Sequence, residues 1–153
     1  MLALAALAAP LSLSACKHRG EATSAPFTES AAKARAAELE KHLARHPDDD
    51  PAALELASLQ WLHLRATATA VPTFDRLASK GNPYAQLARL LIADARLDLA
   101  TVRTQAQALI KGAGKPGLGP ADAAERAALA ELAARYLANW TEHRAHSEAY
   151  VGR

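Results

Sequence analysis

The chain has 153 residues, of which 50% are apolar and only 5% aromatic, and its formal net charge is +2. This length corresponds to one ordinary domain with enough residues to bury a core. Basic and acidic residues are interleaved along the chain, which excludes the concentrated basic face of a nucleic-acid-binding protein. Abundant alanine and few aromatic residues favour closely packed helices over a sheet. We therefore expect an all-α protein with no nucleic-acid partner.

The chain starts with a predominantly apolar segment, residues 1–15, that contains no charged side chain. The segment is shorter than the roughly 20 residues that a membrane-spanning helix requires, so we interpret it as the hydrophobic part of a signal peptide. It ends in Leu13-Ser14-Ala15-Cys16. These four residues resemble the lipobox of bacterial lipoproteins, in which a signal peptidase cleaves directly before the cysteine.

The lipobox resemblance implies that Cys16 becomes the N-terminus of the mature protein and carries a diacylglycerol together with an acylated amine, typically palmitate. Several acyl chains anchor a protein stably, whereas a single chain binds a membrane only reversibly. Cys16 is the only cysteine, so it cannot form an internal disulfide. The alternatives are a secreted protein cleaved nearby and a buried structural cysteine. No Lys or Arg precedes the apolar segment, a departure from the usual signal peptide that leaves open a start codon further upstream.

Residues 17–26 are polar and contain Gly, Ser and Pro, which is typical of a flexible tether. In the enterobacterial lipoproteins that this segment resembles, Asp after the cysteine retains the protein in the inner membrane. Lys17 at this position therefore implies the outer membrane, facing the periplasm. We expect a signal peptide over residues 1–15, a lipidated cysteine and tether over 16–27, and a helical domain over 28–153.

Helix-starting residues recur from Thr28 onward. Thr28 is expected to cap a first helix that runs to about His46. Asp50 is expected to cap a second helix, with Pro51 at its first position, where the missing N–H has no cost. This second helix should continue to about Arg65.

A third helix is expected to start at a Thr69 cap, with Pro72 in its first turn, and to end at Gly81. Asn82 and Pro83 are then expected to open a fourth helix. A tight turn near Arg96 and a fifth helix from Asp98 to Lys111 should follow. Residues 112–120 are rich in Gly and Pro and predict a loop. A last helix is expected from about Ala121, with an apolar stripe at spacings of three and four made of Leu129, Leu132, Tyr136 and Trp140.

Five or six helices joined by short turns predict antiparallel helix pairs. Within the second and third helices, large and small residues recur at the spacing of one known repeat: Leu54, Ala57, Ser58, Trp61, Ala70 and Phe74, with Leu77 continuing the same face. This pattern resembles the tetratricopeptide repeat, a 34-residue helix pair with the signature W-x2-L-G-x2-Y, A-x3-F and P. Pro83 lies one residue later than the proline of that family.

The resemblance covers about one repeat, because residues 84–111 match it poorly and the first helix would supply a trailing half-repeat. It implies a short solenoid of five to six helices. The alternative is that the same residues form the core of an unrelated helical bundle. In both cases they are buried and not catalytic.

Candidates for chemistry are weak. His42 and His46 are four residues apart but lack a third metal ligand and the Glu of the zinc-protease helix motif. The acidic residues 48–50 are explained by helix capping. Residues 112–117 read GAGKPG, but Pro116 stands where a phosphate-binding loop carries Ser or Thr. We therefore expect no catalytic residue, no metal and no cofactor.

The sequence predicts a non-enzymatic adaptor of the cell envelope, anchored by lipid at Cys16, which binds a protein partner through its helical-repeat surface. Lipoproteins that resemble it include pilotins and scaffolds of cell-wall enzymes. The alternative is a periplasmic inhibitor or immunity lipoprotein that blocks a toxin or enzyme and uses a dense charged patch. A hydrolase would need a pocket with convergent polar groups.

Overall fold

The computed structural model describes residues 28–114 and 121–151, with side chains through residue 142. Over these ranges the chain forms six α-helices and no strand. They are α1 (Glu29–Leu43), α2 (Asp50–Leu62), α3 (Thr67–Ser79), α4 (Pro83–Ala95), α5 (Leu99–Gly112) and α6 (Ala123–Val151). The prediction of an all-α fold is confirmed, whereas the signal segment and the tether lie outside the described residues.

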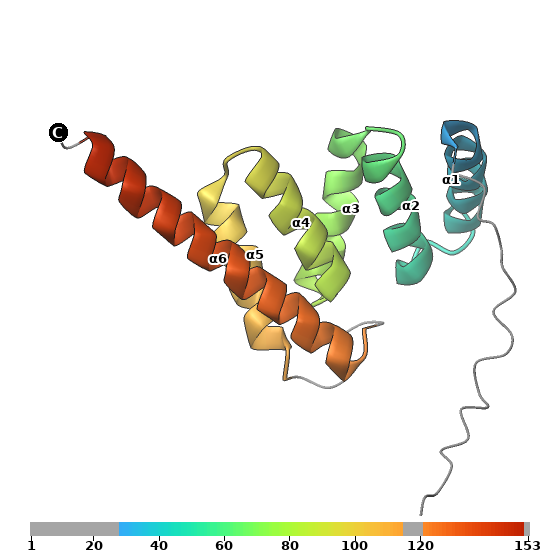
Figure 1. Ribbon diagram of the computed structural model, residues 1–153. Helices are drawn as coiled ribbons and strands as arrows, with labels where there is room; N and C mark the ends of the chain where they lie inside the picture. Colours follow the sequence, from blue (N-terminus) through green and yellow to red (C-terminus); the bar gives the residue numbers. More distant parts are fainter. Residues whose placement is uncertain (1–27, 115–120, 152–153) are drawn as a thin grey trace, which may run out of the picture.

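The helices form a short helical-repeat solenoid. Each helix packs mainly against the helices before and after it in the chain, so that α1 to α5 stand side by side in sequence order (Figure 1). The long α6 crosses α5 and also contacts α4, closing this end of the row (Figure 1). The fold therefore has a core spread along one direction rather than gathered at one centre.

The same burial pattern recurs in alternate helices. Each of α1, α3 and α5 buries three residues in an i, i+4, i+7 arrangement: Ala32, Ala36 and Leu39; Ala70, Phe74 and Leu77; Val102, Ala106 and Leu109. Buried residues of α2 and α4 correspond at one constant sequence offset: Ala52 with Ala85, Ala53 with Gln86, Ala57 with Leu90, and Leu59 with Ile92. The structure thus contains a half-repeat followed by two helix pairs, with α6 starting a third.

Three predicted helix caps are confirmed, at Thr28, Asn82 and Asp98. The Thr28 hydroxyl accepts a hydrogen bond from the Ala31 amide at 3.2 Å. The Asn82 side chain accepts from the amides of Tyr84 and Ala85, both at 3.1 Å. These local signals fix the starts of α1 and α4 because each side chain satisfies an amide that has no partner within its own helix.

The predicted start of the second helix is wrong by one residue. The cap is Asp49, whose carboxylate accepts from the Ala52 amide at 3.0 Å, and Asp50 is the first residue of α2. Any of the three consecutive aspartates can cap a helix, so the local sequence does not choose among them. The choice follows from packing, because the side chain of Asp50 is bound by Arg76 of α3 and by Lys80 directly after that helix.

The third helix starts earlier than predicted. It begins at Thr67 after Ala66, without a side-chain cap, so Thr69 lies within the first turn and Pro72 lies inside the helix. The helix before it ends at Leu62 rather than near Arg65, which adopts a left-handed conformation with φ of 54°. Because this backbone conformation cannot continue a helix, the chain reverses there and enters α3 directly. The first helix also ends sooner than the predicted His46, at Leu43.

The turns that end α3 and α4 have the same hydrogen bonds but different residues. After α3, Gly81 has a φ of 85° and the Asn82 amide donates to the Leu77 carbonyl at 3.1 Å. After α4, Leu97 has a φ of 59° and the Asp98 amide donates to the Ala93 carbonyl at 2.9 Å. Both are the common left-handed helix ending that favours glycine, and in the second a leucine occupies the glycine position.

The last helix begins with reciprocal capping. The Asp122 carboxylate accepts from the Glu125 amide at 2.8 Å, and the Glu125 carboxylate accepts from the Asp122 amide at 3.1 Å. Its apolar stripe differs from the prediction at one position. Leu132 is 38% exposed, and Ala133 is fully buried in its place against α4 and α5. A small residue at the contact lets neighbouring helices approach closely, and the larger leucine is left on the outer side.

Candidate functional site

The residues predicted as the repeat core lie between α2, α3 and α4. Ala70, Phe74 and Leu77 are fully buried and Ala57 nearly so, while Leu54 and Trp61 pack against them from the edge. The rings of Trp61 and Phe74 meet edge to face, with centroids 5.9 Å apart. Ser58 is half-buried, and its hydroxyl donates to the Leu54 carbonyl at 2.8 Å. These side chains hold helices together and present no reactive group.

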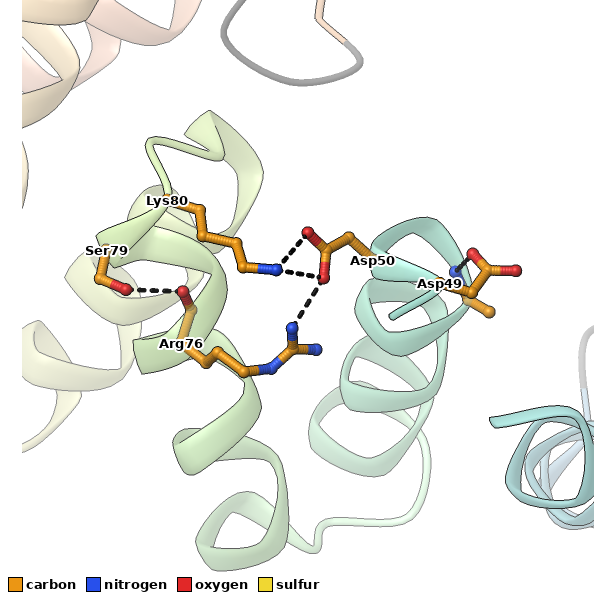
Figure 2. A network of polar contacts seen from close by, with 6 residues as sticks. Asp49, Asp50, Arg76, Ser79 and Lys80 are labelled. Carbon is orange, nitrogen blue, oxygen red and sulfur yellow. Dashed lines mark hydrogen bonds and ion pairs between the residues drawn. The ribbon is translucent and has the colours of Figure 1, made fainter. Parts of the chain in front are cut away.

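The acidic residues 48–50 do not converge on one point. Figure 2 shows the side chains of Asp49 and Asp50 on opposite sides of the start of α2. Asp50 binds the Lys80 ammonium at 2.8 Å and the Arg76 guanidinium at 2.7 Å, which lowers the pKa of its carboxyl group. The pKa of Asp49 is also lowered, by the Ala52 amide and then by His42. The two carboxylates therefore fasten α2 to its neighbours in different directions.

Ion pairs also cross the other interfaces of the first four helices. Arg35 of α1 binds both carboxylate oxygens of Glu55 on α2, at 2.7 and 3.0 Å, and lowers the pKa of that carboxyl group. Arg89 of α4 pairs with Asp75 of α3. Because these charges are used between neighbouring helices, α1 to α4 carry much of their charge as pairs rather than as a patch of one sign.

The histidine pair lies at the end of α1, with His42 in its last turn and His46 in the connection to α2. The Nε2 atom of His42 lies 2.7 Å from the Asp49 carboxylate, and the rings of His42 and His46 are 4.8 Å apart. Within residues 28–114 and 121–142, no three His, Cys, Asp or Glu side chains lie together as possible metal ligands. The glycine-rich candidate begins at Gly112, the last residue of α5, and its residues 115–117 lie outside the described residues, as does Cys16.

The surface feature that best fits a binding role surrounds Trp140 on α6. Trp140 separates two hollows, one of about 230 Å³ lined by Leu99, Val102, Arg103, Leu137 and Thr141, and one of about 310 Å³ lined by Asp94, Tyr136 and Asn139. The indole N–H donates to Asp94 Oδ1 at 2.8 Å, which fixes the ring between them. We call this feature the Trp140 surface.

Two leucines at the turn between α4 and α5 add to the apolar character of this end of the solenoid. Leu97 is 75% exposed and Leu99 is 41% exposed, and Leu99 also lines one of the hollows beside Trp140. The sequence predicted Trp140 only as part of an apolar stripe. The sequence did contain an indication of an exposed apolar surface: Leu97 and Leu99 flank the predicted helix cap Asp98, at a turn where polar residues are usual.

No family model matches the chain, and no curated protein and no solved structure is significantly similar to it. Among the helices that the structure describes, none has both the length and the apolar character needed to span a membrane.

Proposed function

We propose that the chain is a lipid-anchored adaptor of the bacterial cell envelope that binds a protein partner through its helical-repeat surface. The anchor is Cys16, within the lipobox-like sequence Leu13-Ser14-Ala15-Cys16. The proposed location is the outer membrane, facing the periplasm, on account of Lys17. A solenoid supports this role because it exposes one side of every helix and thereby offers a large surface for its size.

The single observation that carries the binding role is the Trp140 surface. A tryptophan held between two hollows, with exposed leucines at the adjacent turn, has the composition of an interface centre, where buried aromatic anchors provide most of the binding energy. Trp140 lines both hollows, so an extended peptide or the apolar face of a partner helix could occupy both. A pilotin-like role or a scaffold for a cell-wall enzyme would use such a surface.

Binding is favoured over catalysis by the positions of the perturbed acidic groups. The aspartates with lowered pKa values, Asp49, Asp50 and Asp98, are helix caps or cross-helix ion pairs. Structural ion pairs and caps perturb pKa values in this way without forming a reactive site. The inhibitor or immunity alternative would be favoured by a dense charged patch, whereas the ion pairs of α1 to α4 distribute both signs along the solenoid.

The experiment that tests the proposal is affinity purification of the solubilised full chain from envelope membranes, followed by mass spectrometry. Cys16→Ala should move the protein from the membrane to the soluble fraction. Trp140→Ala should weaken partner binding by about thirtyfold and reduce the recovered partner accordingly, since loss of one interface anchor costs about 2 kcal/mol. Leu132→Ala, on another part of α6, is the matched control and should recover the partner as the wild type does.

Three results would contradict the proposal, the first being that the wild-type chain recovers no partner. Wild-type protein that stays soluble when it is expressed with its own N-terminal segment would reject the anchor. A partner that is recovered equally well with Trp140→Ala and with Leu132→Ala would reject the Trp140 surface as its binding site.

A further inference from the structure

A second cavity, distinct from the Trp140 surface, lies where the start of α4, the end of α5 and the first turns of α6 meet. Its volume is about 230 Å³. It is lined by Gly81, Pro83, Gln86, Ala108, Leu109, Lys111, Gly112 and Arg126. Two of these side chains are cationic, and none of the lining residues is acidic.

The two cations of this cavity are not neutralised by the described part of the chain. Neither Lys111 nor Arg126 forms an ion pair there, in contrast to Arg35, Arg76 and Arg89. A cavity lined by two unpaired cations attracts an anion, because nearby low-dielectric walls strengthen the interaction.

The guanidinium of Arg126 has an unused donor. Its Nη1 atom donates to the Ala121 carbonyl, but its Nε atom is buried and has no hydrogen-bond partner in the described residues. The acidic residues nearest to it along α6, Asp122 and Glu125, are engaged in their reciprocal cap, and Glu125 also accepts from the Tyr84 hydroxyl at 2.9 Å. A buried donor without an acceptor is unfavourable, so an anion that reaches it gains a charge-assisted hydrogen bond.

The rest of the lining determines which kind of anion fits. Pro83, Ala108 and Leu109 form an apolar wall beside the cations. A phosphate group carries polar oxygens on all sides and would leave some of them against this wall, whereas a carboxylate attached to a small apolar group matches both parts. The planar guanidinium also suits the two oxygens of a carboxylate.

We propose that this cavity binds a carboxylate carried by a compact apolar group, with the carboxylate at Lys111 and Arg126 and the apolar group against Pro83, Ala108 and Leu109. Two sources have this chemistry: the C-terminal residue of a polypeptide and a free short-chain carboxylic acid. The first source rests on the proposed adaptor function, because it would make the C-terminus of the partner part of the recognised segment.

The test is calorimetric titration of the detergent-solubilised full chain at low salt with four probes. The acetylated peptide Gly-Ala-Leu with a free C-terminal carboxylate should bind, and the same peptide with a C-terminal amide should bind at least about tenfold more weakly. The other two probes, 4-methylpentanoate and its amide, contain the same chemistry without a peptide. Tighter binding of the peptide acid than of 4-methylpentanoate identifies a polypeptide C-terminus, and equal binding identifies a free acid.

Variants assign the binding to the cavity. Arg126→Gln should weaken the carboxylate probe by about tenfold, and Arg126→Lys, which keeps the charge but loses the planar group, should have an intermediate effect. Lys111→Gln should weaken binding severalfold. Arg96→Gln, a change at an exposed cation of the turn after α4, is the matched control and should leave binding unchanged. Circular dichroism of each variant shows that the fold is retained.

The proposal is overturned if neither acid binds, if acid and amide bind equally, or if Arg126→Gln binds the carboxylate as the wild type does. These results leave the adaptor function intact, because that function is tested separately by partner recovery with Trp140→Ala. Conversely, a carboxylate that binds at Arg126 in a chain that recovers no partner supports the cavity and rejects the adaptor.

Discussion

The indole N–H of Trp140 and the carboxylate of Asp94 form a 2.8 Å hydrogen bond between α6 and α4, two helices that are not consecutive in the chain. At the other end of the same pair, the Tyr84 hydroxyl donates to Glu125 at 2.9 Å, which raises the pKa of Tyr84. The Tyr84–Glu125 contact joins the first turn of α4 to the first turn of α6. The Asp94–Trp140 contact joins the last turn of α4 to a later part of α6. The two helices therefore run in the same direction, as the first helices of successive repeats do in a solenoid.

The Asp94–Trp140 contact is expected to stabilise the position of α6. Asp94→Ala should lower the free energy of unfolding by about 1–2 kcal/mol, because it leaves the half-buried indole N–H without its charged acceptor. Asp94→Asn keeps an acceptor oxygen and should cost less than half as much. Urea unfolding followed by circular dichroism at 222 nm measures both. Equal losses for the two variants would mean that the hydrogen bond does not contribute to stability.

Leu97 is expected to be a site where glycine stabilises the protein. Its φ of 59° places a leucine in the left-handed region, and its side chain is 75% exposed, so little packing offsets the strain. Leu97→Gly should raise the free energy of unfolding by about 1 kcal/mol. Leu97→Ala is the control, since it removes the exposed side chain but keeps the Cβ atom that causes the strain. A thermal melt in which alanine stabilises as much as glycine would contradict this explanation.

Phe74 is expected to be the most sensitive position of the predicted repeat core. It is fully buried between α2, α3 and α4, so Phe74→Ala should cost about 3–5 kcal/mol, a large part of the 5–15 kcal/mol that stabilises a typical domain. Leu132→Ala removes a large apolar side chain that is 38% exposed and should cost less than about 1 kcal/mol. Chemical denaturation compares the two. A similar loss of unfolding free energy for Phe74→Ala and Leu132→Ala would show that Phe74 is not part of the core.

Asp50 is expected to make stability depend on acid pH. Its pKa is lowered by Lys80 and Arg76, so its contribution is complete above the unfolded-state value of about 3.9 and is lost as the pH falls through the lower folded-state value. Asp50→Asn should therefore be less stable than the wild type at pH 7, by up to about 1 kcal/mol for these partly exposed pairs. The difference should shrink as the pH is lowered from about 5 to about 2.

The control for this pH dependence is Asp48→Asn, because Asp48 is exposed and forms no ion pair with a described residue. At pH 7 its unfolding free energy should be close to that of the wild type, because no ion pair is lost. A difference between Asp50→Asn and wild type that stays constant from pH 7 to pH 2 would show that the carboxylate charge is not the cause.

The local sequence was sufficient for much of the fold. Thr28, Asn82 and Asp98 were predicted as helix starts and are the observed caps, because a cap depends only on a side chain and the amides two or three residues later. The alternation of helix pairs also followed from composition and spacing. The start of α2 could not be predicted to the residue, since the position of Asp50 depends on Lys80 and Arg76 of a different helix.

The candidate binding features were less accessible to prediction. Lys111 and Arg126 line one cavity because α5 and α6 pack together. The two residues lie on different helices, and the sequence does not show how those helices are placed relative to each other. The stripe of α6 was wrong at Leu132, because large apolar residues were expected at contacts where the close approach of helices requires the small Ala133. Both results depend on contacts between helices rather than on the residues of one helix.

The linear packing of the solenoid gives its two ends different mechanical properties. α1 packs mainly against α2 and contributes two alanines and one leucine to the buried core, whereas α4 packs against α3, α5 and α6. Under a pulling force applied on the N-terminal side of Thr28, α1 would separate from α2 at low force while the remaining helices stayed folded. The first helix would thus unfold before the part of the chain that contains Trp140 and the cavity at Lys111 and Arg126.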